Sequence, residues 1–179
     1  MISADLRRRL ACPRCTRPPG HVACEAEYAP RAACPCGGPD KPGLREEEGA
    51  LLCACCGTRY PVLAAAGYVD LLPAAGEGTA TLYDDHEFQE RLRVSAAPPL
   101  LSARVKADMM LRMLDPRPGE PVLDLGCGAG KLAVYAARGG TPAAGLDAAP
   151  FFLPRAAAVV DLALGDLRRL PFRKGAYAR

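Results

Sequence analysis

The fold is decided by residues 122–130, which read VLDLGCGAG. Residues 122–125 have the apolar pattern of a short buried strand, and Gly126, Gly128 and Gly130 follow it. Residues 131–138 then have the composition of a helix. Glycine permits positive φ and has no Cβ, so a ligand can approach the backbone closely, and the N-terminus of the following helix presents unpaired N–H groups. This pattern predicts a strand, turn and helix that bind the polar end of a ligand.

Further strands and helices are expected around this unit. Residues 143–146 and 159–164 read as short strands and residues 150–158 as a weak helix, which makes the order β-α-β-α-β. Before the unit, residues 81–94 are predicted to form a short amphipathic helix. A second helix is predicted over residues 101–114, with Leu101, Val105, Met109 and either Arg112 or Met113 at helical spacing. We expect its apolar stripe to pack on a sheet.

Acidic residues follow the second and third predicted strands. Asp147 lies about 20 residues beyond the glycine turn, where a carboxylate can accept both hydroxyls of a ribose. Asp166 follows the third strand. Singly, Asp147 also reads as a cap and Asp166 as a turn former, and the glycines as a structural turn. Their occurrence in order on one β-α-β-α-β frame favours a ligand site.

These segments resemble the class I, Rossmann-like methyltransferases that use S-adenosylmethionine (SAM). The resemblance implies that Asp124 helps to hold the amino group of the methionine moiety, that Asp147 binds the ribose, and that Asp166 contacts the adenine amino group with Leu167 beside the ring. It implies no catalytic residue. The expected cofactor-binding residues are Asp124, Gly126, Cys127, Gly128, Gly130, Asp147, Asp166 and Leu167. Within this set, Cys127 is interpreted as loop packing and not as a nucleophile.

A nicotinamide dinucleotide is the alternative ligand for a glycine turn. Its fingerprint would place glycine or alanine at position 131, where this chain has Lys131, and Asp124 is atypical of a pyrophosphate-binding turn. SAM is therefore favoured.

Eight of the nine cysteines lie before residue 57. Clustered cysteines in reducing surroundings indicate metal binding better than disulfides. Two C-x-x-C pairs, Cys12 with Cys15 and Cys53 with Cys56, can surround one zinc ion tetrahedrally. Such a closed site has no open coordination position, so we expect a structural role for the zinc.

The second pair continues as C-x-x-C-G-x-x-Y-P-V over residues 53–62. This phrase resembles the zinc ribbon of the large-subunit ribosomal RNA guanine-N1 methyltransferases, and also a small ribbon protein that activates several tRNA and ribosomal methyltransferases. The resemblance implies ribosomal or transfer RNA as a substrate class. The chain departs from it by an insertion that contains three further cysteines, Cys24, Cys34 and Cys36. Together with Cys55 they supply the four thiols that a second zinc ion would need.

The expected fold class is α/β, with a zinc ribbon over residues 1–73, a linker and helical segment over 74–118, and the N-terminal half of a SAM-binding domain over 119–179. The sheet of the family has seven strands, and this chain reads as ending after the third. We therefore expect a partial domain in which one edge of the first strand is unpaired.

The sequence predicts a SAM-dependent methyltransferase whose acceptor is an RNA base or, because small-molecule enzymes share the same half, a small molecule. A zinc-ribbon module that binds or activates a partner through a non-catalytic Rossmann half is the alternative. The net charge of +3, from 23 basic and 20 acidic residues, indicates no dedicated nucleic-acid binder. No signal peptide or membrane span is apparent, so a cytoplasmic protein without a membrane partner is expected.

Overall fold

The computed structural model describes residues 2–16, 43–72, 85, 87–88, 90–91, 100–150, 159–173 and 175–177. The predicted connector after residue 73, residues 151–158 of the weak helix expected over 150–158, and the additional cysteines Cys24, Cys34 and Cys36 lie outside these ranges. Of the helix expected over 81–94, residues 87, 88, 90 and 91 are helical.

One seven-stranded sheet crosses the molecule in the order β1-β2-β3-β4-β7-β6-β5. Its first four strands form an antiparallel meander: β1 (Leu44–Glu47), β2 (Ala50–Cys53), β3 (Arg59–Leu63) and β4 (Tyr68–Asp70). The other three are mutually parallel: β5 (Val122–Leu125), β6 (Ala143–Asp147) and β7 (Asp161–Leu164). The predicted α/β class is confirmed, but four of the seven strands come from the cysteine-rich half of the chain.

The hairpin between β1 and β2 shows how local sequence sets the meander. Glu47 pairs with Ala50 across a two-residue loop, Glu48 and Gly49, and both loop residues have positive φ, 39° and 74°. Such a loop has the twist that flanking strands require, and glycine adopts it without a steric cost.

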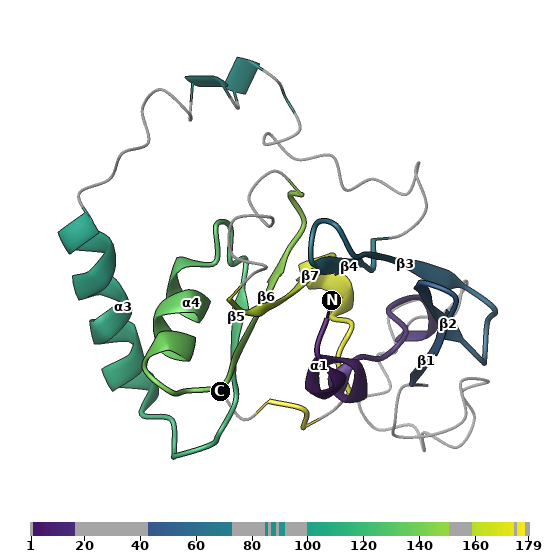
Figure 1. Ribbon diagram of the computed structural model, residues 1–179, viewed down its shortest axis with the longest axis horizontal. Coiled ribbons are helices and arrows are strands. Elements are labelled where there is room, and N and C mark those ends of the chain that lie inside the picture. The colour runs from purple at the N-terminus through teal and green to yellow at the C-terminus, as the bar shows by residue number, and fades with distance from the viewer. Residues whose placement is uncertain are drawn as a thin grey trace, which may run out of the picture.

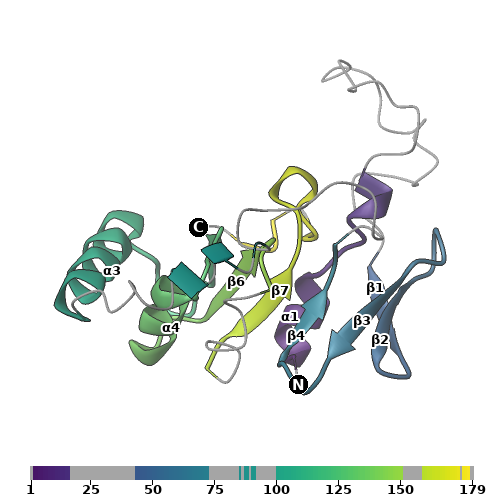
Figure 2. The ribbon, with the colours of Figure 1, turned by 90° about the horizontal axis from the view of Figure 1, so that it is seen from above.

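Strand β4 joins the two halves of the sheet. It pairs in parallel with β7, with Tyr68 opposite Leu162 and Asp70 opposite Leu164, and the two strands lie side by side in Figures 1 and 2. At the other end of the order, β5 has no second neighbouring strand among the described residues, as expected. The domain bounds at residues 73 and 118 remain a prediction, while the sheet itself continues across them.

The helices flank this sheet. Helix α4 (Lys131–Arg138) contacts β5 and β6, and α3 (Leu100–Leu114) contacts α4, so that α3 is the outermost element in Figure 1. The expectation that the α3 stripe packs on a sheet is wrong: Val105, Met109 and Met113 are 50%, 57% and 83% exposed, and within residues 104–114 only Ala107 is buried. The short helices are α1 (Ala4–Arg9), η1 (Arg14–Thr16) and η5 (Leu167–Arg169). None of the helices in the described part of the chain has the length and hydropathy needed to span a bilayer.

The larger of two hydrophobic clusters in the described residues extends through both halves. Leu6 of α1, Tyr60 of β3 and Val69 of β4 share it with Leu146 of β6 and Phe172, which follows η5. Burial of apolar surface, the main favourable term in folding, therefore depends on the two halves together.

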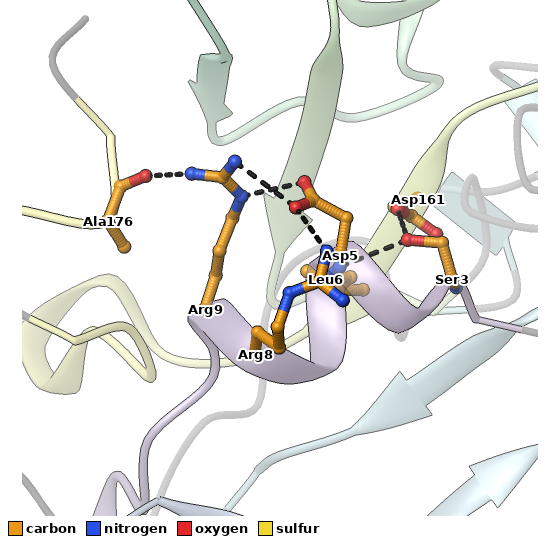
Figure 3. Close-up of polar contacts among 7 residues, drawn as sticks. All are labelled: Ser3, Asp5, Leu6, Arg8, Arg9, Asp161 and Ala176. Carbon is orange, nitrogen blue, oxygen red and sulfur yellow. Dashed lines mark hydrogen bonds and ion pairs between the residues drawn. The ribbon is translucent and has the colours of Figure 1, made fainter.

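Hydrogen bonds connect helix α1 and its N-cap residue to the segment that contains the parallel strand β7 (Figure 3). The N-cap residue Ser3 accepts a hydrogen bond from Leu6 N–H, and its own backbone N–H and hydroxyl donate to the carboxylate of Asp161 at the start of β7. At the other end of the helix, Arg9 pairs with Asp5, donates to the carbonyl of Ala176 and lies over the ring of Tyr177. One helix of six residues thus contacts both ends of the segment that contains β7 and η5.

Candidate cofactor site and cysteine cluster

The glycine loop has the strained backbone that its sequence predicts. Gly126, Gly128 and Gly130 have φ of 74°, 50° and 66°, values that side chains with a Cβ rarely adopt. The loop is fixed to the neighbouring strand, since the N–H groups of Gly126 and Cys127 both donate to the carbonyl of Leu146 at 2.8 and 3.1 Å. The predicted strand and helix bounds, 122–125 and 131–138, coincide with those of β5 and α4.

Asp147, the last residue of β6, holds the loop from the side. Its Oδ2 accepts the N–H of Gly128 at 2.7 Å, and its Oδ1 accepts the N–H of Ala149 at 2.8 Å. A carboxylate offers about four acceptor sites, so these two bonds leave capacity for hydroxyl donors of a ligand. Sequence reasoning assigned a ribose to Asp147 and did not foresee that it also positions the glycine loop.

Asp124 lies half-buried on β5 beneath the same loop. Burial raises the pKa of its carboxyl group, the backbone N–H of Ala133 in α4 opposes that shift, and the negative charge of Asp147 adds to it. Among the described residues, no lysine or arginine forms an ion pair with Asp124 or Asp147. Two interacting carboxylates without a cationic partner favour a ligand that carries positive charge.

Cys127 packs into the space above Gly145 of β6. A Cβ built on Gly145 would lie 2.8 Å from the Sγ of Cys127 and 2.8 Å from the Cδ2 of Leu162, so only glycine fits there. Burial raises the pKa of the Cys127 thiol to about 12, and the charges of Asp124 and Asp147 act in the same direction. A thiol that stays protonated at neutral pH is a poor nucleophile. Gly145 was missed as a site residue, although glycine inside a strand is a known signal of close approach.

Asp166 and Leu167 complete this end of the sheet. Asp166 follows β7 and caps η5 by accepting the N–H of Arg168. The side chain of Leu167 reaches the glycine loop, where its Cδ1 lies 3.9 Å from the Cβ position of Gly126. The predicted cofactor residues therefore meet at the carboxyl ends of three adjacent parallel strands, where open α/β sheets bind ligands.

The four cysteines of the two predicted pairs also meet. The Sγ atoms of Cys12, Cys15, Cys53 and Cys56 all lie within 4.8 Å of one another. The separation is 3.6 Å between Cys12 and Cys56 and 3.7 Å between Cys15 and Cys53. A disulfide would require about 2 Å, whereas a tetrahedral site with Zn–S bonds of about 2.3 Å has edges of about 3.8 Å. The donor set and its geometry fit a zinc ion, with Cys55 exposed outside the cluster.

Two hydroxyl groups support this cluster. The hydroxyl of Tyr60, which is 3% exposed, lies 3.1 Å from the Sγ of Cys12, and the hydroxyl of Thr58 lies 3.1 Å from the Sγ of Cys56. Burial raises the pKa of the Cys12 and Cys15 thiols. Burial also acts to raise the pKa of Cys56, but hydrogen bonds from Thr58 and the neighbouring thiols bring it down to about 6. Hydroxyl donors of this kind stabilise metal-bound thiolates.

No protein-family model matches the chain. An uncharacterized methyltransferase of Synechocystis, sll0829, is 44% identical over 63 residues, which are 34% of this chain and 30% of the relative. Two solved structures superpose in part. YjhP from E. coli, at 24% identity and a TM-score of 0.29, aligns over 34% of this chain and 29% of its own. The second is the magnesium protoporphyrin IX methyltransferase ChlM from Synechocystis PCC 6803, with bound SAH. It aligns at 22% identity and a TM-score of 0.33 over 53% of this chain and 44% of its own.

The matched region thus spans less than a third of the length of the curated relative. About a third of this chain is similar in sequence to a protein named as a methyltransferase.

Proposed function

We propose that this chain forms the SAM-binding half of a SAM-dependent methyltransferase. The observation that carries the proposal is the glycine loop held by Asp147 through Gly128, at the end of the sheet where Asp124 and Asp166 also lie. The partial sequence similarity to a methyltransferase supports it.

Charge favours SAM over a dinucleotide at this loop. SAM carries a sulfonium and an ammonium group, which the carboxylates of Asp124 and Asp147 attract. A dinucleotide would bring a pyrophosphate anion to the same place, and the two carboxylates would repel it. Their negative charges already act on each other, since the charge of Asp147 contributes to the raised pKa of Asp124.

SAM supplies an electrophilic methyl group, which an acceptor nucleophile takes as the carbon–sulfur bond breaks and S-adenosylhomocysteine (SAH) leaves. The residues of this chain would act by holding the cofactor: the glycine loop at the methionine end, Asp147 at the ribose, and Asp166 with Leu167 at the adenine. Orientation of two reactants can supply a large part of such a rate enhancement.

We propose zinc as the ion of the four-cysteine cluster and a structural role for it, because four thiolates close its coordination. An RNA base is the acceptor class to test first, on the ground of the ribbon phrase over residues 53–62. Small molecules are the second class, because the same cofactor half serves both.

The test is calorimetric titration of the zinc-loaded chain with SAM and SAH. We expect saturable binding of one equivalent, which D147A abolishes because the loop loses its support and the ribose its acceptor. D108A removes an exposed carboxylate on α3 and should bind like the wild type. A folded, zinc-loaded chain that binds neither ligand would contradict the proposal and favour the non-catalytic ribbon module.

A further inference from the structure

The carboxylate of Asp166 is held by one neighbouring arginine. The backbone N–H of Arg168 donates to Oδ1 at 2.8 Å. Its guanidinium adds three contacts, from Nε to Oδ1 and to Oδ2 at 3.0 Å each and from Nη2 to Oδ2 at 2.8 Å. These hydrogen bonds lower the pKa of Asp166, so it is ionised at neutral pH. Asp166 thus receives four N–H contacts from a single residue.

Three N–H groups make these four contacts, and together they engage both oxygens of the carboxylate. An ionised carboxyl group has about four acceptor sites, and the side chain of Asp166 is only 10% exposed, so few positions remain for a new donor. A ligand amino group can bind there only if an existing donor leaves. The backbone N–H is fixed in the first turn of η5, which leaves the guanidinium as the group that can be displaced.

The two partners differ in their freedom to move. The side chain of Arg168 is 69% exposed, whereas that of Asp166 is 10% exposed. A guanidinium that leaves Asp166 is therefore solvated by water, which lowers the cost of its displacement.

We propose that Arg168 competes with the adenine amino group for Asp166, so that the adenine end of the cofactor binds by displacing the guanidinium. The inference rests on the proposed SAM site and adds to it a residue that controls access to its adenine position.

The competition makes the 6-amino group a requirement for displacement. Adenine brings a donor that replaces the guanidinium at Asp166. A 6-oxo purine brings an acceptor, which an ionised carboxylate repels, so Arg168 stays on Asp166 when such a ligand binds. Removal of the guanidinium should therefore strengthen binding of adenine ligands, whereas 6-oxo ligands, which face the unpaired carboxylate, gain nothing.

Arg169 provides a matched control, because it lies next to Arg168 in η5 and carries the same charge. We would titrate the zinc-loaded wild type, R168A, R168Q and R169A with SAH and with S-inosylhomocysteine, its 6-oxo analogue. For R168A and R168Q we expect the Kd of SAH to fall about threefold, as for loss of an exposed competing ion pair. For the inosine analogue we expect no fall in Kd in either variant, because its 6-oxo group then faces an unpaired carboxylate, and we expect a wild-type Kd for R169A with both ligands.

Ionic strength supplies a second readout. Salt screens the exposed guanidinium pair more than a hydrogen bond from a neutral amino group. The gain of R168A over the wild type with SAH should therefore shrink from 20 mM to about 500 mM salt, while R169A shows no such trend.

Two failures are distinguishable. If the wild type and R169A bind SAH and R168A binds it no better or more weakly, Arg168 orients Asp166 instead of competing, and the inference is overturned while the SAM site stands. If none of the folded proteins binds SAH, the proposed function and the inference fail together.

Discussion

The backbone N–H of Ala11 donates a hydrogen bond of 2.9 Å to the carbonyl oxygen of Pro171. Ala11 precedes Cys12 of the cysteine cluster, and Pro171 belongs to the segment that follows Asp166 and η5. Leu10 and Phe172 form a β-bridge beside this bond, and both side chains lie in the shared core. The cysteine cluster and the adenine side of the proposed cofactor site are thus joined by one short stretch of backbone.

Metal removal should therefore destabilise the whole sheet. Structural zinc contributes on the order of 10 kcal/mol to the folding of small zinc domains, and two of the proposed ligands here, Cys12 and Cys53, belong to a core that β6 and β7 share. We expect chelation, or C15S, to lower the melting temperature by about 10 °C or more in a single transition followed by circular dichroism. C55S, which changes an exposed cysteine outside the cluster, should melt like the wild type. Two transitions, of which only the lower responds to chelation, would contradict this prediction.

Substitution in the glycine loop should separate backbone strain from ligand binding. Gly128 and Gly140 both have positive φ, 50° and 84°, and a Cβ on either meets no atom within 4 Å. G128A and G140A should therefore each cost about 1 kcal/mol of folding free energy in urea unfolding. Only G128A should also weaken SAH binding, by about tenfold or more, because its Cβ enters the face of the loop assigned to the ligand. Equal SAH affinities in the two variants would remove the loop from the site.

Gly145 and Cys127 should be energetically coupled. In G145A the new Cβ meets the Sγ of Cys127 and the Cδ2 of Leu162 at 2.8 Å each, an overpacking expected to cost about 2 kcal/mol. C127A removes one of these two clashes. The double variant G145A/C127A should therefore be more stable than the sum of the single effects predicts, by about 1 kcal/mol in a double-mutant cycle. Strict additivity would show that the sulfur does not occupy this space.

The Cys127 thiol should make stability fall at alkaline pH. Its folded pKa of about 12 lies above the ordinary value of about 8.5 for an unfolded chain. Below pH 8.5 both states hold the proton and the stabilisation is complete. Between there and pH 12 the unfolded state loses the proton first, so the free energy of unfolding falls by up to about 1.4 kcal/mol per pH unit.

Urea unfolding at pH 8, 9 and 10 checks this, because the wild type should lose stability more steeply than C127A. C55S serves as the control and should follow the wild type. Parallel curves for the wild type and C127A would show that the thiol is not buried as described.

Local patterns predicted the strand, the helix and the cysteine cluster of the candidate site better than they predicted the packing around it. The short apolar run before Gly126 and the helix after Gly130 are set by neighbours in sequence, so β5 and α4 begin and end where they were expected. The cysteine cluster follows from two pairs whose spacing matches zinc coordination. In both cases the chemistry lies within a few residues of the motif.

Relationships between distant segments were not predictable in this way. The pairing of β4 with β7 depends on strands of three and four residues, too short for a pattern that selects a partner. Within residues 104–114 of α3, the buried position is held by the small side chain of Ala107, which a search for large apolar residues overlooks. The bond of Arg168 to Asp166 depends on a rotamer of a long side chain, which spacing does not reveal.

The contact between Ser3 and Asp161 also bears on how the chain folds as it is made. The two residues are 158 positions apart, and a ribosome adds residues in order from the N-terminus at about 5–20 per second. Helix α1 is therefore synthesised well before its N-cap partner on β7 and its contact at Ala176. Such long-range pairing slows folding and keeps apolar surface exposed for longer. Helix α1 thus has to wait for a residue 158 positions beyond Ser3 before the contacts that hold it can form.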